Sequence, residues 1–171
     1  MFYDDRPKIV IKKDQTDRIV DSAIWVIVIG MFAVNLYLYS DLPDKIPAHF
    51  SLDGTVNRYD NKSFIWLMPI ISVVLCYIMN TITKYPHSFN YTEKITEENA
   101  EQHYKAGSKM MRFVNLSVSV LLFIVNYQIL DVALNGEAKH MTWTNYALII
   151  IVTLMTIVPL ILAIKGKSTK K

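Results

Sequence analysis

The residues best suited to chemistry lie in one polar stretch between two apolar runs, where His49 has Asp44, Asp53 and Asp60 nearby in sequence. Imidazole titrates near physiological pH and carboxylates can complete a cation site, so the stretch could bind a metal or sense protons. One histidine is weak support for a metal, and we predict no metal site. The favoured role of His49 is a hydrogen bond to the backbone of its own loop, which we predict to be a hairpin, or to the turn at Asp53-Gly54. Contact with a partner or ligand is the alternative.

A second set of polar residues lies inside the apolar runs. Asn115, Ser119 and Asn126 span 4 and 11 positions, which places them within about 40° of one another on a helix. Asp21 and Asn35, 14 positions apart, share a face by the same geometry. Such residues are costly in a membrane unless they face other helices, so this intramembrane polar stripe predicts interhelical hydrogen bonds. A substrate or proton path is the alternative. Such a path would need a carboxylate near the middle of the membrane, and neither Asp21 nor Asp131 lies deep enough.

Familiar catalytic patterns are missing from the sequence. It contains no H-E-x-x-H, G-x-S-x-G or C-x-x-C pattern. The single cysteine, Cys76, allows neither an internal disulfide nor a thiolate zinc site. We therefore predict that the chain is not an enzyme and needs no cofactor.

The elements that hold these residues are long apolar runs. The chain has 171 residues, 52% hydrophobic and 19% charged, with a positive mean hydropathy of +0.24. Crossing a bilayer takes roughly 20 apolar residues, and four segments meet that length: 19–40, 64–83, 112–134 and 145–164. The expected fold class is therefore all-α, a polytopic integral membrane protein with four transmembrane helices. Its expected partner is the lipid bilayer, since a net charge of +3 is too mild for nucleic acid.

The basic residues predict the orientation of these spans. Segments 1–18, 84–112 and 165–171 hold 14 of the 18 lysines and arginines. By the positive-inside rule, the N-terminal segment 1–18, the loop 84–111 and the tail 165–171 are cytoplasmic, and the loops 41–63 and 135–144 lie outside. We expect a multi-pass membrane protein with both termini in the cytoplasm.

Two connections carry structure of their own. Pro43 and Pro47 exclude a helix from the outer loop. The pair Asp53-Gly54 favours a two-residue hairpin turn, so we predict a small hairpin or extended lid in 41–63. The inner segment 93–109 is rich in Glu, Lys, Ala and Gln and has no proline, which predicts a helix running into the third span.

The outer loop also resembles a known family. Its motif L-P-x-x-I-P-x-H-F at 42–50, followed by Gly54 and Tyr59, is similar to the signature of the bacterial domain-of-unknown-function family 1648. The segment 86–100, with Pro86, Phe89 and Asn99, resembles four-helix members of that family. The family includes the amino-terminal part of the SdpI-like immunity proteins, which protect a cell against a secreted toxin.

This resemblance implies immunity or envelope-stress sensing through the outer loop, with a peptide toxin or a membrane or cytoplasmic protein as partner. The residues expected to contact a ligand or partner are Pro43, Pro47, His49, Phe50, Asp53, Gly54 and Tyr59. Two other functions stay open. One is a small transporter or lipid-handling component that uses the polar stripe, and the other is an accessory subunit of a membrane complex.

Overall fold

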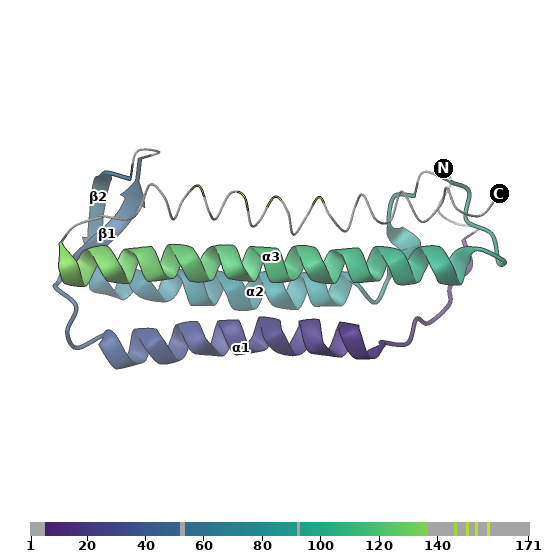
Figure 1. Ribbon diagram of the computed structural model, residues 1–171, viewed down its shortest axis with the longest axis horizontal. Coiled ribbons are helices and arrows are strands. Elements are labelled where there is room, and N and C mark those ends of the chain that lie inside the picture. The colour runs from purple at the N-terminus through teal and green to yellow at the C-terminus, as the bar shows by residue number, and fades with distance from the viewer. Residues whose placement is uncertain are drawn as a thin grey trace.

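The computed structural model describes residues 6–51, 54–91 and 93–136, together with Tyr146, Ile150, Thr153 and Ile157. Three long helices, α1 (Gln15–Leu38), α2 (Leu67–Ile82) and α3 (Ala100–Asn135), lie side by side (Figure 1). Between α1 and α2 come an antiparallel hairpin, β1 (Lys45–Phe50) and β2 (Val56–Asn61), and the 3-10 helix η1 (Lys62–Trp66). A second 3-10 turn, η2 (Pro86–Ser88), precedes α3.

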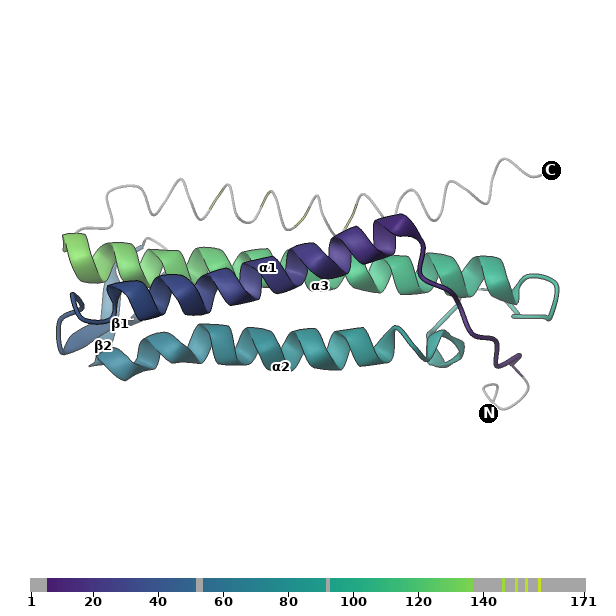
Figure 2. The same cartoon turned by 90° about the horizontal axis from the view of Figure 1, so that it is seen from below.

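The hairpin sits at one end of the bundle, which we call the hairpin end, and α1 and α3 both start at the other, the charged end (Figure 1). Helix α1 therefore runs parallel to α3, while α2 runs antiparallel to both. Helix α3 packs against α1 and α2 along its length (Figure 2). The described part of the chain is mostly helical, and the small sheet is the hairpin that we expected in 41–63.

Helix α1 begins at Gln15, four residues before the predicted start of the first span. The side chain of Asp14 accepts a hydrogen bond from the backbone N–H of Asp17 at 2.9 Å. The Asp17 carboxylate accepts one from the Asp14 N–H at 3.0 Å. This reciprocal cap satisfies two N–H groups at the helix start. The helix can therefore begin in a polar turn that precedes the apolar run.

Helix α3 has 36 residues and is therefore about 54 Å long, against about 30 Å of hydrocarbon in a bilayer. The predicted extension into the third span is present, but its predicted start at Glu93 is wrong. The Asn99 side chain accepts a hydrogen bond from the Thr96 N–H at 2.8 Å and donates one to the Lys94 carbonyl at 3.1 Å. These bonds close a turn, and Ala100 is the first helical residue.

The bundle has apolar side chains on its surface and polar side chains in its interior. Outward positions of α1 such as Val26, Ile29 and Leu36 are apolar and 63 to 71% exposed. Inward positions include Asn35 and Asn126, which are no more than 2% exposed. All three helical segments, 15–38, 62–82 and 100–135, are long and apolar enough to cross a membrane. Lipid is the solvent that accommodates an apolar exterior around a partly polar interior.

The predicted fourth span, 145–164, lies outside the described residues except for four positions. Tyr146, Ile150, Thr153 and Ile157 are helical and exposed. Their spacing of three or four residues places them on one helix face.

Candidate functional site

The two strands of the hairpin pair through five partner positions, from Lys45 opposite Asn61 to Phe50 opposite Val56. The register shifts between Pro47 and Phe50, so the strand is bulged there. The connection is longer than the two-residue turn that we predicted. Its hydrogen bonds run from the Ser51 N–H to the Thr55 carbonyl at 2.8 Å and from the Gly54 N–H to the Ser51 carbonyl at 2.9 Å.

Gly54 is buried and has φ of 89°, so it has the positive φ expected of this turn. A residue with a side chain would be strained there, most of all a β-branched one. The neighbouring Asp53 lies outside the described residues.

The hairpin is anchored to the bundle by an apolar cluster at the hairpin end: Leu42, Ile46, Ile65, Ile129 and Leu130. Ile46 and Pro47 are almost completely buried, Phe50 packs partly against the cluster, and Pro43 and Tyr59 are exposed. The described loop residues among those that we predicted therefore divide into anchors and surface residues. Pro47 and Phe50 face the protein, whereas Tyr59 and His49 face outward.

His49 hydrogen-bonds across the hairpin, with its Nδ1 2.6 Å from the Asn57 Oδ1. The amide of Asn57 in turn donates to the Ser51 hydroxyl at 3.1 Å. The partner of His49 is thus a side chain and not the backbone or turn that we predicted. With the Asn57 oxygen as acceptor, Nδ1 carries the proton and Nε2 keeps a lone pair. Neutral His49 can therefore accept a hydrogen bond from a ligand or partner.

The strand pairing does not place Asp60, one of the carboxylates expected around His49, beside that histidine. Asp60 faces Ile46 in the register, whereas His49 faces Arg58. No group of three residues able to hold a metal ion occurs among the described residues.

Four of the five residues of the intramembrane polar stripe, all except Asp21, are buried, and the two halves of the stripe meet. The Nδ2 of Asn35 donates to the Asn126 Oδ1 at 3.0 Å, and the Nδ2 of Asn126 donates back to the Asn35 Oδ1 at 2.8 Å. Asn35 Nδ2 also donates to the Ile65 carbonyl at 3.1 Å. The pair thus links α1, α3 and the 3-10 helix η1 through hydrogen bonds.

The middle of the stripe is less fully bonded. The Ser119 hydroxyl donates to the Asn115 carbonyl at 2.9 Å and lies 3.3 Å from the Cys76 sulfur on α2. The Asn115 Oδ1 and the Ser72 hydroxyl are buried and have no hydrogen-bond partner among the described residues. Among the described residues, the middle of the helix interface therefore has fewer hydrogen bonds than the Asn35 and Asn126 pair.

At the charged end, the polar stripe is made of charged and not neutral residues. Asp21 belongs there to an ion cluster around the buried Arg112 and Asp17. Arg112 on α3 lies between two aspartates of α1. Its Nη1 is 3.5 Å from the Asp17 Oδ1, and its Nε is 3.3 Å from the Asp21 Oδ1. The side chains of Arg112 and Asp17 are 7% and 3% exposed. Lys13 adds a contact to Asp21 at 2.6 Å.

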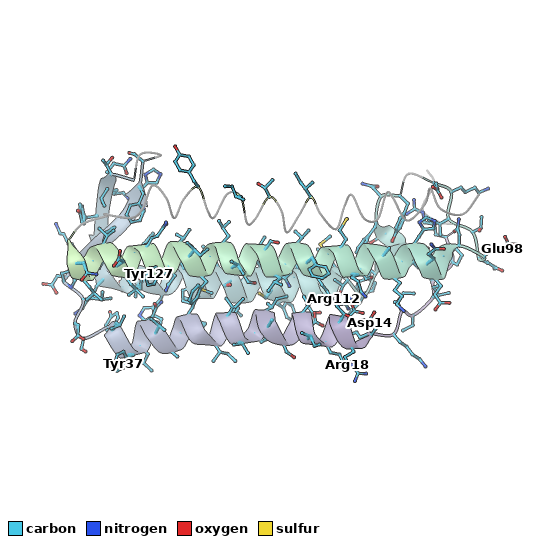
Figure 3. The ribbon with its side chains drawn as sticks, in the orientation of Figure 1. Asp14, Arg18, Tyr37, Glu98, Arg112 and Tyr127 are labelled. Atoms are coloured by element: carbon cyan, nitrogen blue, oxygen red, sulfur yellow. The ribbon has the colours of Figure 1, made fainter. Side chains whose placement is uncertain are left out.

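Asp14 and Lys109 extend this cluster to the surface, with 2.6 Å between the carboxylate and Nζ. Figure 3 shows Asp14 and Arg112 at the same end of the bundle. The hydrogen bond from Lys109, followed by the backbone bond from Asp17, lowers the pKa of Asp14 to about 2. Sequence reasoning missed the pairing of Asp17 with Arg112. The available signal was spacing, because Asp14, Asp17 and Asp21 lie three and four residues apart, and Lys109 and Arg112 lie three apart.

The segment before α3 forms a cap at the charged end. The Tyr91 hydroxyl donates to the Pro86 carbonyl at 2.8 Å, and the Arg6 guanidinium lies 5.5 Å from the centre of the Tyr91 ring. Arg6 Nη1 also donates to the carbonyls of His87 at 3.0 Å and Phe89 at 2.6 Å. Burial raises the pKa of Tyr91 above its usual range.

Comparison with known proteins identifies part of the chain. Residues 26–73 match the family model "Domain of unknown function (DUF1648)". This segment runs from α1 through the hairpin to α2, so it contains the loop and three residues of its anchor, Leu42, Ile46 and Ile65. The expected resemblance to that family is confirmed for this segment. No curated protein matches the chain, and no solved structure does.

Proposed function

We propose that the chain is an integral membrane protein that uses its hairpin to recognise a membrane-active peptide, in immunity or envelope-stress sensing. The observation that carries this proposal is the anchoring of the hairpin. Ile46 and Ile65 are fully buried against α3, while Tyr59 and His49 stay exposed. A hairpin fixed in this way presents its outward groups in one arrangement, which lowers the ordering cost of binding.

The position of the hairpin supports the same function. It lies at one end of the bundle, beside the last turns of α3 (Figure 1), and in a helix bundle that crosses a membrane that end is near the bilayer surface, where a peptide would first arrive. The exposed Nε2 of His49 can accept a hydrogen bond, and Tyr59 offers an apolar ring with a polar tip. Peptide recognition through this surface requires no catalytic group.

The test is protection of a sensitive bacterium against a panel of membrane-active peptides. Survival and membrane potential are measured for the native chain, His49→Ala and Gly54→Val at matched protein levels. His87→Ala, at the charged end, is the matched control for the histidine substitution. Protection that His49→Ala and Gly54→Val lose and His87→Ala keeps supports the proposal. Native protein that behaves like the empty vector, or equal protection by all variants, contradicts it.

The polar stripe suggests a second function, transport or lipid handling, because Ser72 and Asn115 have interior polar atoms with no hydrogen-bond partner in the part of the chain that the structure describes. This function predicts that Asn126→Leu abolishes activity without lowering the amount of folded protein. The closed pair between Asn35 and Asn126 favours a structural role, in which the same substitution lowers stability.

A further inference from the structure

A shallow cavity opens where the hairpin meets α2. Its volume is about 320 Å³, and its walls include Asp60 of β2, Phe64 and Trp66 of η1, and Leu67 and Ile70 of α2. This volume is typical of a small-ligand site. Leu67 and Ile70 are 38% and 52% exposed, so the cavity is open along the apolar side of α2.

The rim of this cavity carries one charge of each sign. Arg58 and Asp60 are two residues apart on β2, so their side chains leave the same face of the strand. The Arg58 guanidinium lies 5.8 Å from the centre of the Phe64 ring, which is a cavity wall. Asp60 accepts a hydrogen bond from the Asn61 N–H at 2.9 Å. Among the ion pairs of the described residues, neither charge takes part.

The depth of the cavity restricts what can occupy it. It lies at the start of the membrane-span candidate 62–82, where Trp66 packs against Tyr39 with ring centres 5.7 Å apart. Aromatic residues at the end of a span mark the headgroup level of a bilayer. One turn further along α2, the exposed Ile70 reaches the hydrocarbon. An occupant must therefore combine charged groups for the rim with an apolar chain for Ile70.

We propose that this cavity binds a phospholipid with a primary amine in its headgroup, from the leaflet on the hairpin side. The phosphate lies at Arg58, the ammonium donates hydrogen bonds to Asp60, and an acyl chain follows Leu67 and Ile70. A charge-assisted hydrogen bond to a carboxylate needs N–H donors, so a primary amine fits better than a quaternary one. The site goes beyond the proposed function because it needs no peptide.

Trp66 is the reporter for the test. In a Trp25→Phe/Trp143→Phe background it is the one tryptophan left. The protein is reconstituted in vesicles containing brominated phosphatidylethanolamine, phosphatidylglycerol or phosphatidylcholine, and the bromines quench a tryptophan that they touch. We expect phosphatidylethanolamine to bind about threefold or more tightly than the other two, since an exposed ion pair is worth less than a factor of ten.

Substitutions at the rim of the cavity test which residues cause the preference for phosphatidylethanolamine. Asp60→Asn is expected to bring the ratio of the phosphatidylethanolamine and phosphatidylglycerol affinities close to one, and Arg58→Gln to weaken binding of both lipids. Asp41→Asn, an exposed carboxylate on the connection between α1 and β1, is the matched control and should keep the preference. A second control retains Trp25 alone, through Trp66→Phe/Trp143→Phe, and should show no preference. Equal quenching of Trp66 by the three lipids, or a preference that survives Asp60→Asn, would overturn the proposal.

Discussion

The pair between Asn35 and Asn126 makes a sharp prediction about stability. Two hydrogen bonds join the amides, at 2.8 and 3.0 Å, and a third joins Asn35 to the Ile65 carbonyl at 3.1 Å. Asn126→Leu removes the first two and leaves the Asn35 oxygen buried without a donor. Hydrogen bonds between membrane helices average about 0.6 kcal/mol. The loss of two bonds therefore predicts that the free energy of unfolding falls by about 1.2 kcal/mol.

A double-mutant cycle isolates this energy from other effects of the substitutions. Asn35→Leu and Asn126→Leu, alone and combined, are compared by unfolding in mixed micelles with a rising fraction of denaturing detergent. Because each single variant already removes the pair, the coupling energy should be about 1 kcal/mol. The double variant should therefore be less destabilised than the sum of the single variants.

Asn115→Leu is the matched control, because it changes a buried asparagine on the same helix whose Oδ1 has no partner among the described residues. Its cost should stay below about 0.5 kcal/mol, less than the average hydrogen bond of this kind. The reasoning would be refuted if the costs of the two single variants simply added in the double variant. It would also be refuted if Asn115→Leu cost as much as Asn126→Leu.

Three further predictions concern the charged end. Arg112→Met leaves the buried Asp17 without its cation and should cost about 3 kcal/mol or more in the same unfolding assay; a cost below that of an exposed ion pair would contradict the cluster. Gly107→Ala would place a Cβ 2.9 Å from the Tyr91 hydroxyl and should lower the free energy of unfolding by about 1–3 kcal/mol. Adding Tyr91→Phe removes that hydroxyl and should restore part of the loss. Unfolding of the two single variants and of the double variant measures both effects. The pKa of Asp14 is lowered from 3.8 to about 2, so its stabilising contribution is present above pH 3.8 and is lost as the pH falls toward 2. Proteolysis of the α1 start should accelerate over that range in the native chain and not in Asp14→Asn.

The hairpin was predictable because its signals are local. Pro43 and Pro47 exclude a helix, and Gly54 supplies the positive φ that the turn requires. The length of the turn was not predictable from these residues, because it depends on the bulged pairing between the strands. In the same way, the start of α3 at Ala100 depends on the turn that Asn99 closes, which helix propensity does not detect.

The sequence predicted which polar residues face the interior, but it did not predict which residues they contact. The spacing of Asn115, Ser119 and Asn126 placed them on one face, and all three are buried. Asn126 meets Asn35 on α1, 91 positions away, and Ser119 lies against Cys76 on α2, 43 positions away. The register between these helices is set by tertiary packing, so the ion cluster of Asp17 and Arg112 was missed.

The central claim is that the bundle crosses a membrane and carries the hairpin on one side and the charged end on the other. Accessibility of single cysteines to a membrane-impermeant thiol reagent tests it most directly, in a Cys76→Ser background. Asn57→Cys probes the hairpin, Glu98→Cys the charged end (Figure 3) and Ile29→Cys the lipid-facing side of α1. In intact cells, Asn57→Cys should react, Glu98→Cys should react only after the membrane is permeabilised, and Ile29→Cys should not react. Reaction of Asn57→Cys and Glu98→Cys from the same side, or free reaction of Ile29→Cys, would contradict the claim.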